Sequence, residues 1–492
     1  MARPLRLSLP MALPMALAAA GLSSCAVGPD YRPPASPLAG PYPSAALTAT
    51  QPDARPAAVL DHWWSSFDDP VLSDLVVEAL AQNLDIAAAG ARVDQARAAA
   101  RAAGAALAPV GQANAQAARE RQSLQSPTGQ IFSRFPGYQR TGDLYDLNAG
   151  ATWEIDLFGQ LRRNAEAARA DQAAAEAARA GARLTVAAET ADAYIQVRGL
   201  QARLARLRQR IAAQDLVDQL TEQKFGQGVA SEVERAQSRV QAEQTRAAAP
   251  LLEAALAAQL NRLDVLLGEP AGGMRRRLAP SGAIPVPPRI DPGDGPAELL
   301  RRRPDLIAAE QRLAAENARI GVALADYWPK VTLAGLVGQE ATQSGQLLNG
   351  PAQLGAAQAG VSWRLFDFGR VDAEVKAARG RRAEALASWR QAALQAGAEV
   401  EDAAVSLVRR EQQSALLDRA LTAARSAESA TRDSAAAGAA SRIDLAAAEA
   451  SRLLAEDAAL DARTEASRSA VALCRALGGG WSMPDAPTAA KN

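Results

Sequence analysis

The chain has 492 residues, of which 48% are hydrophobic but only 4% aromatic, a composition typical of helix-rich proteins with close helix packing. Lysine and arginine together number 54, as do aspartate and glutamate, so the balanced charge gives no indication of nucleic acid as a partner. With one histidine, His62, and two cysteines, Cys25 and Cys474, a His/Cys metal cluster is excluded, and we expect no cofactor.

The pattern of residues 1–24 predicts a targeting segment. Arg3 and Arg6 precede a mostly apolar stretch that is too short and too broken by proline to span a membrane. The segment ends in Leu-Ser-Ser before Cys25, which resembles a bacterial lipobox, where the peptide is cut and the cysteine thiol is diacylated. Ala26, in place of aspartate, resembles the pattern sent to the outer membrane. We expect a lipid anchor at Cys25; the alternative is an ordinary cleaved signal.

The mature chain is predicted to begin with an extended arm. Residues 25–60 are rich in proline, alanine and serine, a composition typical of a tether and not of a packed domain. A helical pattern then runs from Pro70 to about Ala108, and Pro109 ends it.

Beyond this helix the apolar residues fall on every second position, which is typical of strands with one apolar and one polar face. Residues 110–118 and 145–157 predict one hairpin, and residues 331–337 and 357–365 predict a second. Strands of roughly ten residues cross a bilayer when they are tilted. A soluble antiparallel sheet would alternate in the same way, but no other sheet is predicted to cover the apolar face.

Four strands cannot close a barrel wide enough to enclose a lumen. Three copies of the chain would supply about twelve strands, with every edge paired and a water-filled bore. We therefore expect a homotrimer whose strands contact outer membrane lipid.

A long helical stretch follows each hairpin. Residues 159–228 and 369–438 are equally long, on the order of 100 Å each if continuous. Each stretch ends in a short glycine-containing turn, after which a second helix returns. Ser231 and Ser441 are well placed to cap these returning helices, with Glu234 and Asp444 in their first turns.

These matching parts reveal an internal duplication. Trp153 and Trp363, and likewise Gly228 and Gly438, are 210 positions apart. Between Pro109 and Trp153 the first repeat has ten more residues than the equivalent segment of the second repeat. This difference predicts a longer, outward-facing connection in the first hairpin. The predicted organisation is a signal peptide (1–24), a lipidated arm (25–60), a first repeat (61–268), a linker (269–297), a second repeat (298–480) and a C-terminal tail (481–492).

Two segments resemble a known family. Residues 299–329 resemble the signature of TolC-like outer membrane efflux proteins, and residues 25–34 resemble the start of its lipoprotein branch, which serves resistance-nodulation-division pumps. The resemblance implies a mainly α fold with β structure: a trimeric 12-stranded membrane β-barrel continuous with a periplasmic α-helical barrel. It also implies an inner-membrane pump of that class and a periplasmic adaptor protein as partners.

The resemblance further implies roles for individual residues. Helix tips that meet the adaptor correspond here to Gly226, Gln227, Gly228, Ser231, Gly438 and Ser441. The closed periplasmic mouth corresponds to Ile443 and Asp444. Three copies of Asp444 around an axis would form an acidic ring; alternatively, Asp444 only stabilises the start of its helix.

We therefore expect an outer membrane exit duct of a tripartite efflux system. The alternative is a periplasmic coiled-coil adaptor, or a structural lipoprotein scaffold without a pore. The two hairpins distinguish them, because an adaptor has no use for lipid-length alternating strands. An enzyme is the least favoured class, since His62 fits a packed surface histidine better than a catalytic base. The sequence does not indicate the cargo.

Overall fold

The computed structural model describes residues 26–38, 40–44, 48, 58–291 and 295–481. The predicted signal peptide, Cys25 and the tail beyond Trp481 lie outside the described residues. The first repeat contains η1 (Leu60–Phe67), α3 (Pro70–Gln82), α4 (Leu84–Ala105), β1 (Val110–Arg121), α5 (Pro127–Phe132), β2 (Thr141–Ile155), α6 (Gln160–Gly226) and α7 (Glu232–Leu266). Beyond it lie α8 (Gly273–Arg277), η2 (Pro296–Glu298), α9 (Leu299–Arg302), α10 (Pro304–Ala325), β3 (Lys330–Ala341), η3 (Ser344–Gln346), η4 (Gly350–Ala352), β4 (Gln353–Ser362), α11 (Arg370–Ala436) and α12 (Arg442–Ala476).

The chain forms two compact units, and each combines segments of both repeats. The sheet unit comprises Met1–Pro33, Asp94–Ala173 and Glu310–Ala387. The helical unit comprises Pro34–Val93, Ala174–Ala309 and Ser388–Asn492.

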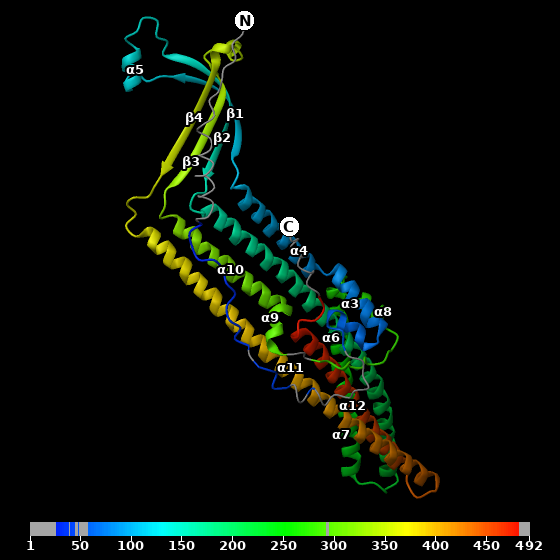
Figure 1. Cartoon of the computed structure of the whole chain (residues 1–492). Coiled ribbons are helices and arrows are strands. Elements are labelled where there is room, and N and C mark those ends of the chain that lie inside the picture. The colour runs from blue at the N-terminus through cyan, green and yellow to red at the C-terminus, as the bar shows by residue number, and fades with distance from the viewer. Residues whose placement is uncertain (1–25, 39, 45–47, 49–57, 292–294, 482–492) are drawn as a thin grey trace, which may run out of the picture. The chain divides into compact units, whose positions relative to one another are not determined.

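In the sheet unit, the four strands form one antiparallel sheet in the order β1-β2-β3-β4. The two predicted hairpins therefore lie side by side, and β1 and β4 are the edge strands of the sheet (Figure 1). The connection from β1 to β2 carries α5 and is longer than the connection from β3 to β4, as predicted from the ten-residue difference.

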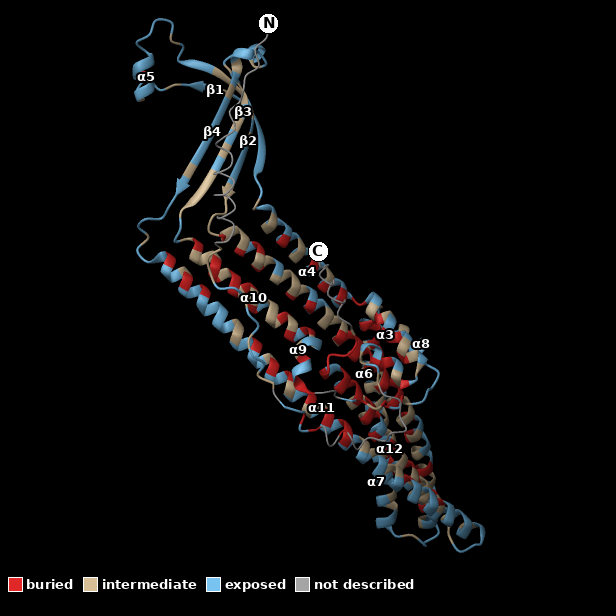
Figure 2. Ribbon diagram, in the orientation of Figure 1, coloured by how far each residue is buried: buried red, intermediate tan, exposed pale blue. Residues whose placement is uncertain are grey.

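The helical unit holds the main hydrophobic core. Tryptophans of η1 pack with residues of α3, α6, α11 and α12, and Trp63 is almost fully buried. Figure 2 shows buried residues concentrated where these helices meet, whereas their tips are exposed. Alanines recur at the helix contacts, which allows helices to pack closely, as the composition predicts.

The prediction of one helix from Pro70 to about Ala108 is wrong. The helix breaks at Asn83, whose backbone is extended, with φ −62° and ψ 130°. Its side-chain Oδ1 accepts hydrogen bonds from the amides of Asp85 and Ile86, which starts α4, and its Nδ2 donates to the Leu266 carbonyl oxygen at 2.9 Å. Asn83 therefore caps the start of a new helix. The apolar periodicity of the predicted helix does not reveal this break.

The long helices match their prediction closely. Both α6 and α11 contain 67 residues. No helix in the described ranges is both long and apolar enough to cross a bilayer.

Candidate functional site

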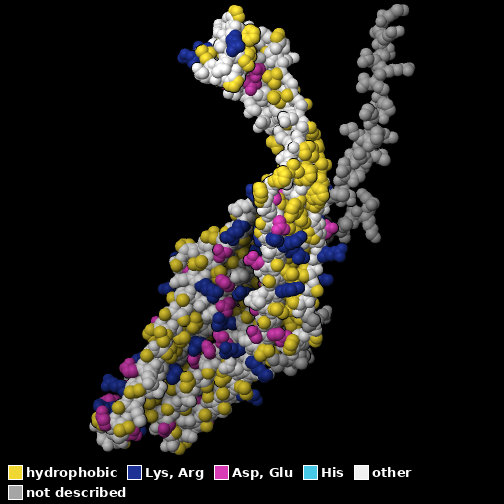
Figure 3. Space-filling model, turned by 90° about the vertical axis from the view of Figure 1, so that its left-hand side faces the viewer, with side chains coloured by type: hydrophobic (Ala, Val, Ile, Leu, Met, Phe, Trp, Pro, Cys, Tyr) yellow, Lys and Arg dark blue, Asp and Glu magenta, His cyan; other side chains and the backbone are white. Residues whose placement is uncertain are grey.

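The sheet has two chemically different faces, and its register keeps them apart. Odd-numbered residues of all four strands face one side, because odd positions pair with odd positions throughout. This side carries Leu147, Ala149, Trp153, Ile155, Val331, Leu333, Val337, Ala357, Ala359 and Val361. Figure 3 shows hydrophobic side chains gathered over the part of the sheet next to its helices.

The opposite face of the sheet is mostly polar, although Leu144, Leu336 and Leu354 also lie on it. It carries Gln112, Asn114, Gln116, Asp146, Asn148, Thr152, Glu154, Thr332, Glu340 and Gln358. Across strands, Asn114 Nδ2 donates to Asn148 Oδ1 at 3.3 Å. A sheet that is apolar on one face and polar on the other suits a wall between lipid and water.

The described part of the arm is fastened to the sheet unit by Arg163, at the start of α6. Its Nη2 donates to the Asp30 carboxylate at 2.8 Å and to the Gly28 carbonyl oxygen at 3.2 Å, while its Nε donates to the Val27 carbonyl oxygen at 3.3 Å. Glu166 accepts from the remaining guanidinium nitrogen at 2.8 Å. The arm therefore lies in a fixed position immediately after Cys25.

Glycines let the arm approach the helices closely. A Cβ on Gly28 would lie 2.5 Å from the Gly321 backbone, and a Cβ on Gly159 would lie 2.7 Å from Ala26. Gly28 and Gly159 also have positive φ, +104° and +82°, which L side chains rarely adopt. The amide of Val27 donates to the Phe158 carbonyl oxygen at 3.0 Å.

In the helical unit, the predicted tip residues lie in two equivalent, exposed turns. Gly228 and Gly438 both adopt positive φ, +71° and +76°, and end the helical hydrogen bonding of α6 and α11. The remaining tip residues, Gly226, Gln227, Ser231 and Ser441, flank these glycines.

Each returning helix begins with the same capping box. Ser231 Oγ accepts from the Glu234 amide at 3.2 Å while Glu234 accepts from the Ser231 amide at 2.7 Å. Ser441 and Asp444 repeat this geometry at 3.2 and 2.8 Å. The bonds from Ser441 lower the pKa of Asp444, and Lys224 on the other hairpin adds a smaller lowering. Asp444 is therefore a charged, exposed helix cap in the single chain, beside the half-buried Ile443.

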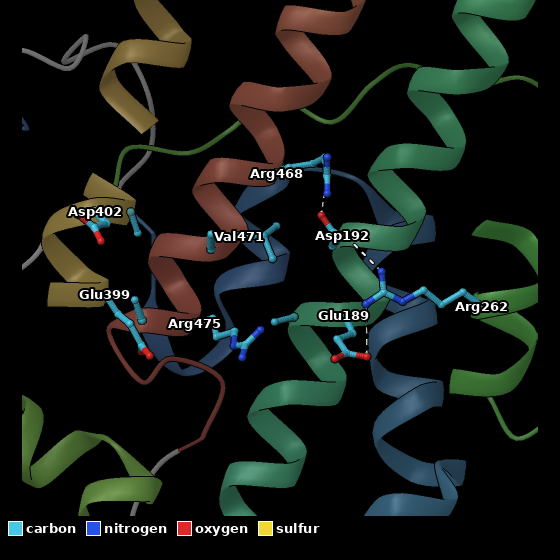
Figure 4. Close-up of a pocket in the computed structure, with 12 residues that line it drawn as sticks. Glu189, Asp192, Arg262, Glu399, Asp402, Arg468, Val471 and Arg475 are labelled. Carbon is cyan, nitrogen blue, oxygen red and sulfur yellow. Dashed lines mark hydrogen bonds and ion pairs between the residues drawn. The ribbon is translucent and has the colours of Figure 1, made fainter. Parts of the chain in front are cut away.

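A charged groove in the helical unit was missed by the sequence analysis (Figure 4). Its volume is about 370 Å³, and α6, α7, α11 and α12 line it. Two acid pairs meet there, Glu189 with Asp192 on α6 and Glu399 with Asp402 on α11. They are 210 positions apart, so the duplication itself was the signal that could have found them.

Three arginines bind these acids. Arg468 of α12 donates to Asp192 at 2.7 Å, and Arg262 of α7 lies 3.4 Å from Glu189. Arg303, between α9 and α10, donates to Glu399 at 2.7 Å. The groove thus links both repeats through ion pairs, which fix the helices relative to one another within this unit. No group of three or more His, Cys, Asp or Glu suited to a metal ion occurs among the described residues.

The sequence-family comparison matches this duplicated architecture. The family model described as "Outer membrane efflux protein" matches residues 75–269 and 295–479, once for each repeat. The chain belongs to the outer membrane efflux protein family. It is an outer membrane efflux channel, as the resemblance of residues 299–329 to the family signature predicted.

Individual relatives agree over nearly the full chain. The pyoverdine export outer membrane protein OpmQ of Pseudomonas aeruginosa is 32% identical over 94% of this chain and 96% of its own length. Outer membrane protein OprJ of the same organism is 31% identical over 94% of this chain and 95% of its own. The solved structure of the outer-membrane channel OprN is 34% identical, with a TM-score of 0.80, and covers 93% of this chain and 100% of OprN.

Proposed function

We propose that three copies of this chain form the outer membrane duct of a tripartite efflux system. The observation that carries the proposal is the four-stranded sheet with one apolar face, one polar face and two edge strands, β1 and β4. An open edge exposes unpaired backbone groups, which hydrocarbon does not tolerate. Pairing β4 of each copy with β1 of the next removes all edges and gives a barrel of about twelve strands.

Burial of the helices next to the sheet supports the same assembly. In α10, Ala315 and Ala318 are buried against Ala167 of α6 in the sheet unit, and Ile320 is buried as well. The equivalent part of α4, residues 94–105, has only Ala100 buried. The start of α11 is likewise far more exposed than the start of α6. A neighbouring copy on each side would cover α4 and α11 as α6 and α10 cover each other.

The duct would receive its cargo at the helix tips. We propose that the tips at Gly226–Ser231 and Gly438–Ser441 contact a periplasmic adaptor, and that a resistance-nodulation-division pump in the inner membrane drives export. The exposure of both turns supports this role. OpmQ exports pyoverdine and TtgF belongs to a toluene efflux pump, so relatives serve different cargoes and a water-filled duct leaves selectivity to the pump.

Two further residues complete the proposal. Cys25 would carry the lipid anchor, and the Arg163 contacts to Val27, Gly28 and Asp30 would hold that anchor beside the sheet. Ile443 and Asp444, just beyond the second tip, would close the periplasmic mouth, with three Asp444 carboxylates forming an acidic ring.

The mass of the detergent-purified protein, combined with complementation, tests the proposal. We expect the mass of three chains, and we expect the gene to restore export in a strain that lacks its own efflux duct. A stable monomer that fails to complement would instead favour the adaptor or scaffold role.

A further inference from the structure

An exposed apolar surface follows β4 directly. We call Trp363, Leu365, Phe366 and Phe368 the aromatic patch; they are 55%, 66%, 89% and 102% exposed. Exposed contiguous apolar residues mark interaction sites in folded proteins. The patch lies outside the strands, at the junction with α11.

The first repeat shows what covers the equivalent junction. Phe158 corresponds to Phe368, and its ring stacks on Trp328 with the centroids 5.0 Å apart and an interplanar angle of 15°. Trp328 directly precedes Pro329 and β3, the strand that pairs with β2. Phe158, which follows the first hairpin, therefore packs on the residue that precedes the second hairpin.

The backbone of Phe368 is also unusual. Its φ is +51°, and Asp68 is the only other non-glycine residue with positive φ in the part of the chain that the structure describes. For a bulky side chain this conformation is unfavourable, and it persists where surrounding contacts stabilise it. The single chain gives the fully exposed Phe368 ring no such contact in its described surroundings.

From these observations we infer that the aromatic patch docks on residues 107–110 of a second copy of this chain. The inference rests on the proposed trimer, in which β1 of the next copy follows β4. Ala108 stands before β1 where Trp328 stands before β3. Ala108 and Pro109 are exposed, and Val110 is 65% exposed.

The two junctions place their large apolar side chain on opposite sides of the contact. In the first repeat, Asp156 occupies the position of Phe366, and Trp328 supplies the large apolar partner. In the second repeat, Phe366 supplies the bulk, and the small Ala108 leaves room for it. Each contact would therefore contain one large and one small side chain, in opposite order in the two repeats.

The helix caps make this exchange possible. Asp156 accepts hydrogen bonds from the amides of Leu161 and Arg162 at the start of α6. At the start of α11 the capping carboxylate belongs to Asp367, which accepts from Gly369 and Val371. The capping carboxylate therefore stands one position later before α11 than before α6. Position 366 is not needed for the cap and can hold phenylalanine.

Chemical cross-linking of the full-length protein in membranes tests the inference. The variant carrying Phe368→Cys and Ala108→Cys is treated with a short bismaleimide, and the products are separated under denaturing conditions. We expect covalent dimers and trimers. The matched control, Phe158→Cys with Trp328→Cys, should cross-link only within one chain and remain a monomer, heavier only by the reagent. Cys474 is fully buried, so it should not react in the folded protein.

The native mass of each variant separates this inference from the proposed function. A trimeric Phe368→Cys, Ala108→Cys variant that forms only monomers after treatment would overturn the docking contact and leave the trimer standing. Strong labelling of Cys at position 368 by a lipid-borne maleimide would also overturn it, because the patch would then face the bilayer. A monomeric wild-type protein would overturn both proposals.

A second variant gives an independent measurement. Phe366→Ser with Phe368→Ser removes the apolar contact, so the trimer should dissociate roughly tenfold faster or more on heating in detergent, since each buried ring stabilises an interface. Phe132→Ser with Phe135→Ser alters an equally aromatic loop between β1 and β2 and should not change this rate. Equal dissociation rates for the two variants would contradict the inference.

Discussion

The indole Nε1 of Trp363 donates a hydrogen bond to the carbonyl oxygen of Tyr327 at 3.0 Å. Trp153 makes the same bond to Leu107, also at 3.0 Å. The bonded residues are 36 positions apart in the second repeat and 46 in the first. Each tryptophan thus closes its own hairpin at the end next to the helices, and the ten additional residues of the first repeat lie within its hairpin.

Replacing Trp363 with phenylalanine should destabilise the second hairpin. The substitution keeps an aromatic ring but leaves the Tyr327 carbonyl oxygen without its indole donor, at a cost of about 1 kcal/mol. Thermal unfolding of the purified protein measures the effect. Trp328→Phe is the matched control, because it keeps a ring against Phe158 and leaves the bond at Tyr327 intact. Equal thermal stability of Trp363→Phe and wild type would show that the bond is dispensable.

Arg163 should determine whether the arm stays bound. Arg163→Ala removes the hydrogen bonds to Val27, Gly28 and Asp30, each charge-assisted. We expect the amide of Val27, which donates to the Phe158 carbonyl oxygen, to exchange hydrogen on the order of 30-fold faster, equivalent to a loss of about 2 kcal/mol. Arg162→Ala, which alters the neighbouring arginine bound to Asp156, is the control. Unchanged exchange in Arg163→Ala would mean that other contacts hold the arm.

Variants of Asp444 separate its two proposed roles. Asp444→Asn keeps an oxygen for the Ser441 cap but removes the charge, whereas Asp444→Ala removes both. If an acidic ring constricts the pore, both variants should raise single-channel conductance and outer membrane leakiness. If Asp444 acts only as a cap, Asp444→Asn should conduct like wild type. Glu234→Ala removes the equivalent cap on the other hairpin and serves as the control.

The capping carboxylates also predict a pH dependence. The folded protein lowers the pKa of both Glu234 and Asp444, chiefly through their bonds to the cap serines. Their contribution to helix stability is therefore complete above the ordinary carboxyl pKa, about 4, and is lost as the pH falls through the lowered values. The protection of the first-turn amides of α7 and α12, taken relative to their intrinsic exchange rate at each pH, should decrease on acidification. Ser231→Ala with Ser441→Ala should abolish most of that dependence; an unchanged dependence would contradict this assignment.

Cys25→Ser tests the lipid anchor. The variant should lack the mass of the acyl chains, and we expect the signal peptide to remain uncleaved by the lipoprotein pathway. Intact-mass spectrometry of the membrane-extracted protein makes the measurement. A mature wild-type protein without added acyl mass would refute the lipobox prediction. Export by Cys25→Ser would show that the barrel inserts without its anchor.

Periodicity predicted most of the fold because it reports which faces are buried. The two-residue period of 145–157 and 357–365 located β2 and β4, and the spacing of 210 matched α6 with α11. The break at Asn83 was missed, since apolar periodicity does not report the side-chain cap that Asn83 forms on the amides of Asp85 and Ile86.

The functional residues were less predictable. Ser231 and Ser441 were identified as caps because a capping box is encoded within four residues. Arg163 and the charged groove were missed, since their contacts join segments far apart in the chain. No interaction was predicted for Phe368; the contrast became visible when the structure placed its counterpart Phe158 against Trp328 and left Phe368 exposed.

Single-channel recording in a planar bilayer tests the central claim most directly. Purified protein that inserts as a trimer should produce discrete ion-conducting steps, and Asp444→Ala should enlarge them if the acidic ring constricts the pore. Protein that is shown to be inserted in the bilayer but carries no current, in the wild type and in Asp444→Ala alike, would contradict the assignment of this chain as an efflux duct.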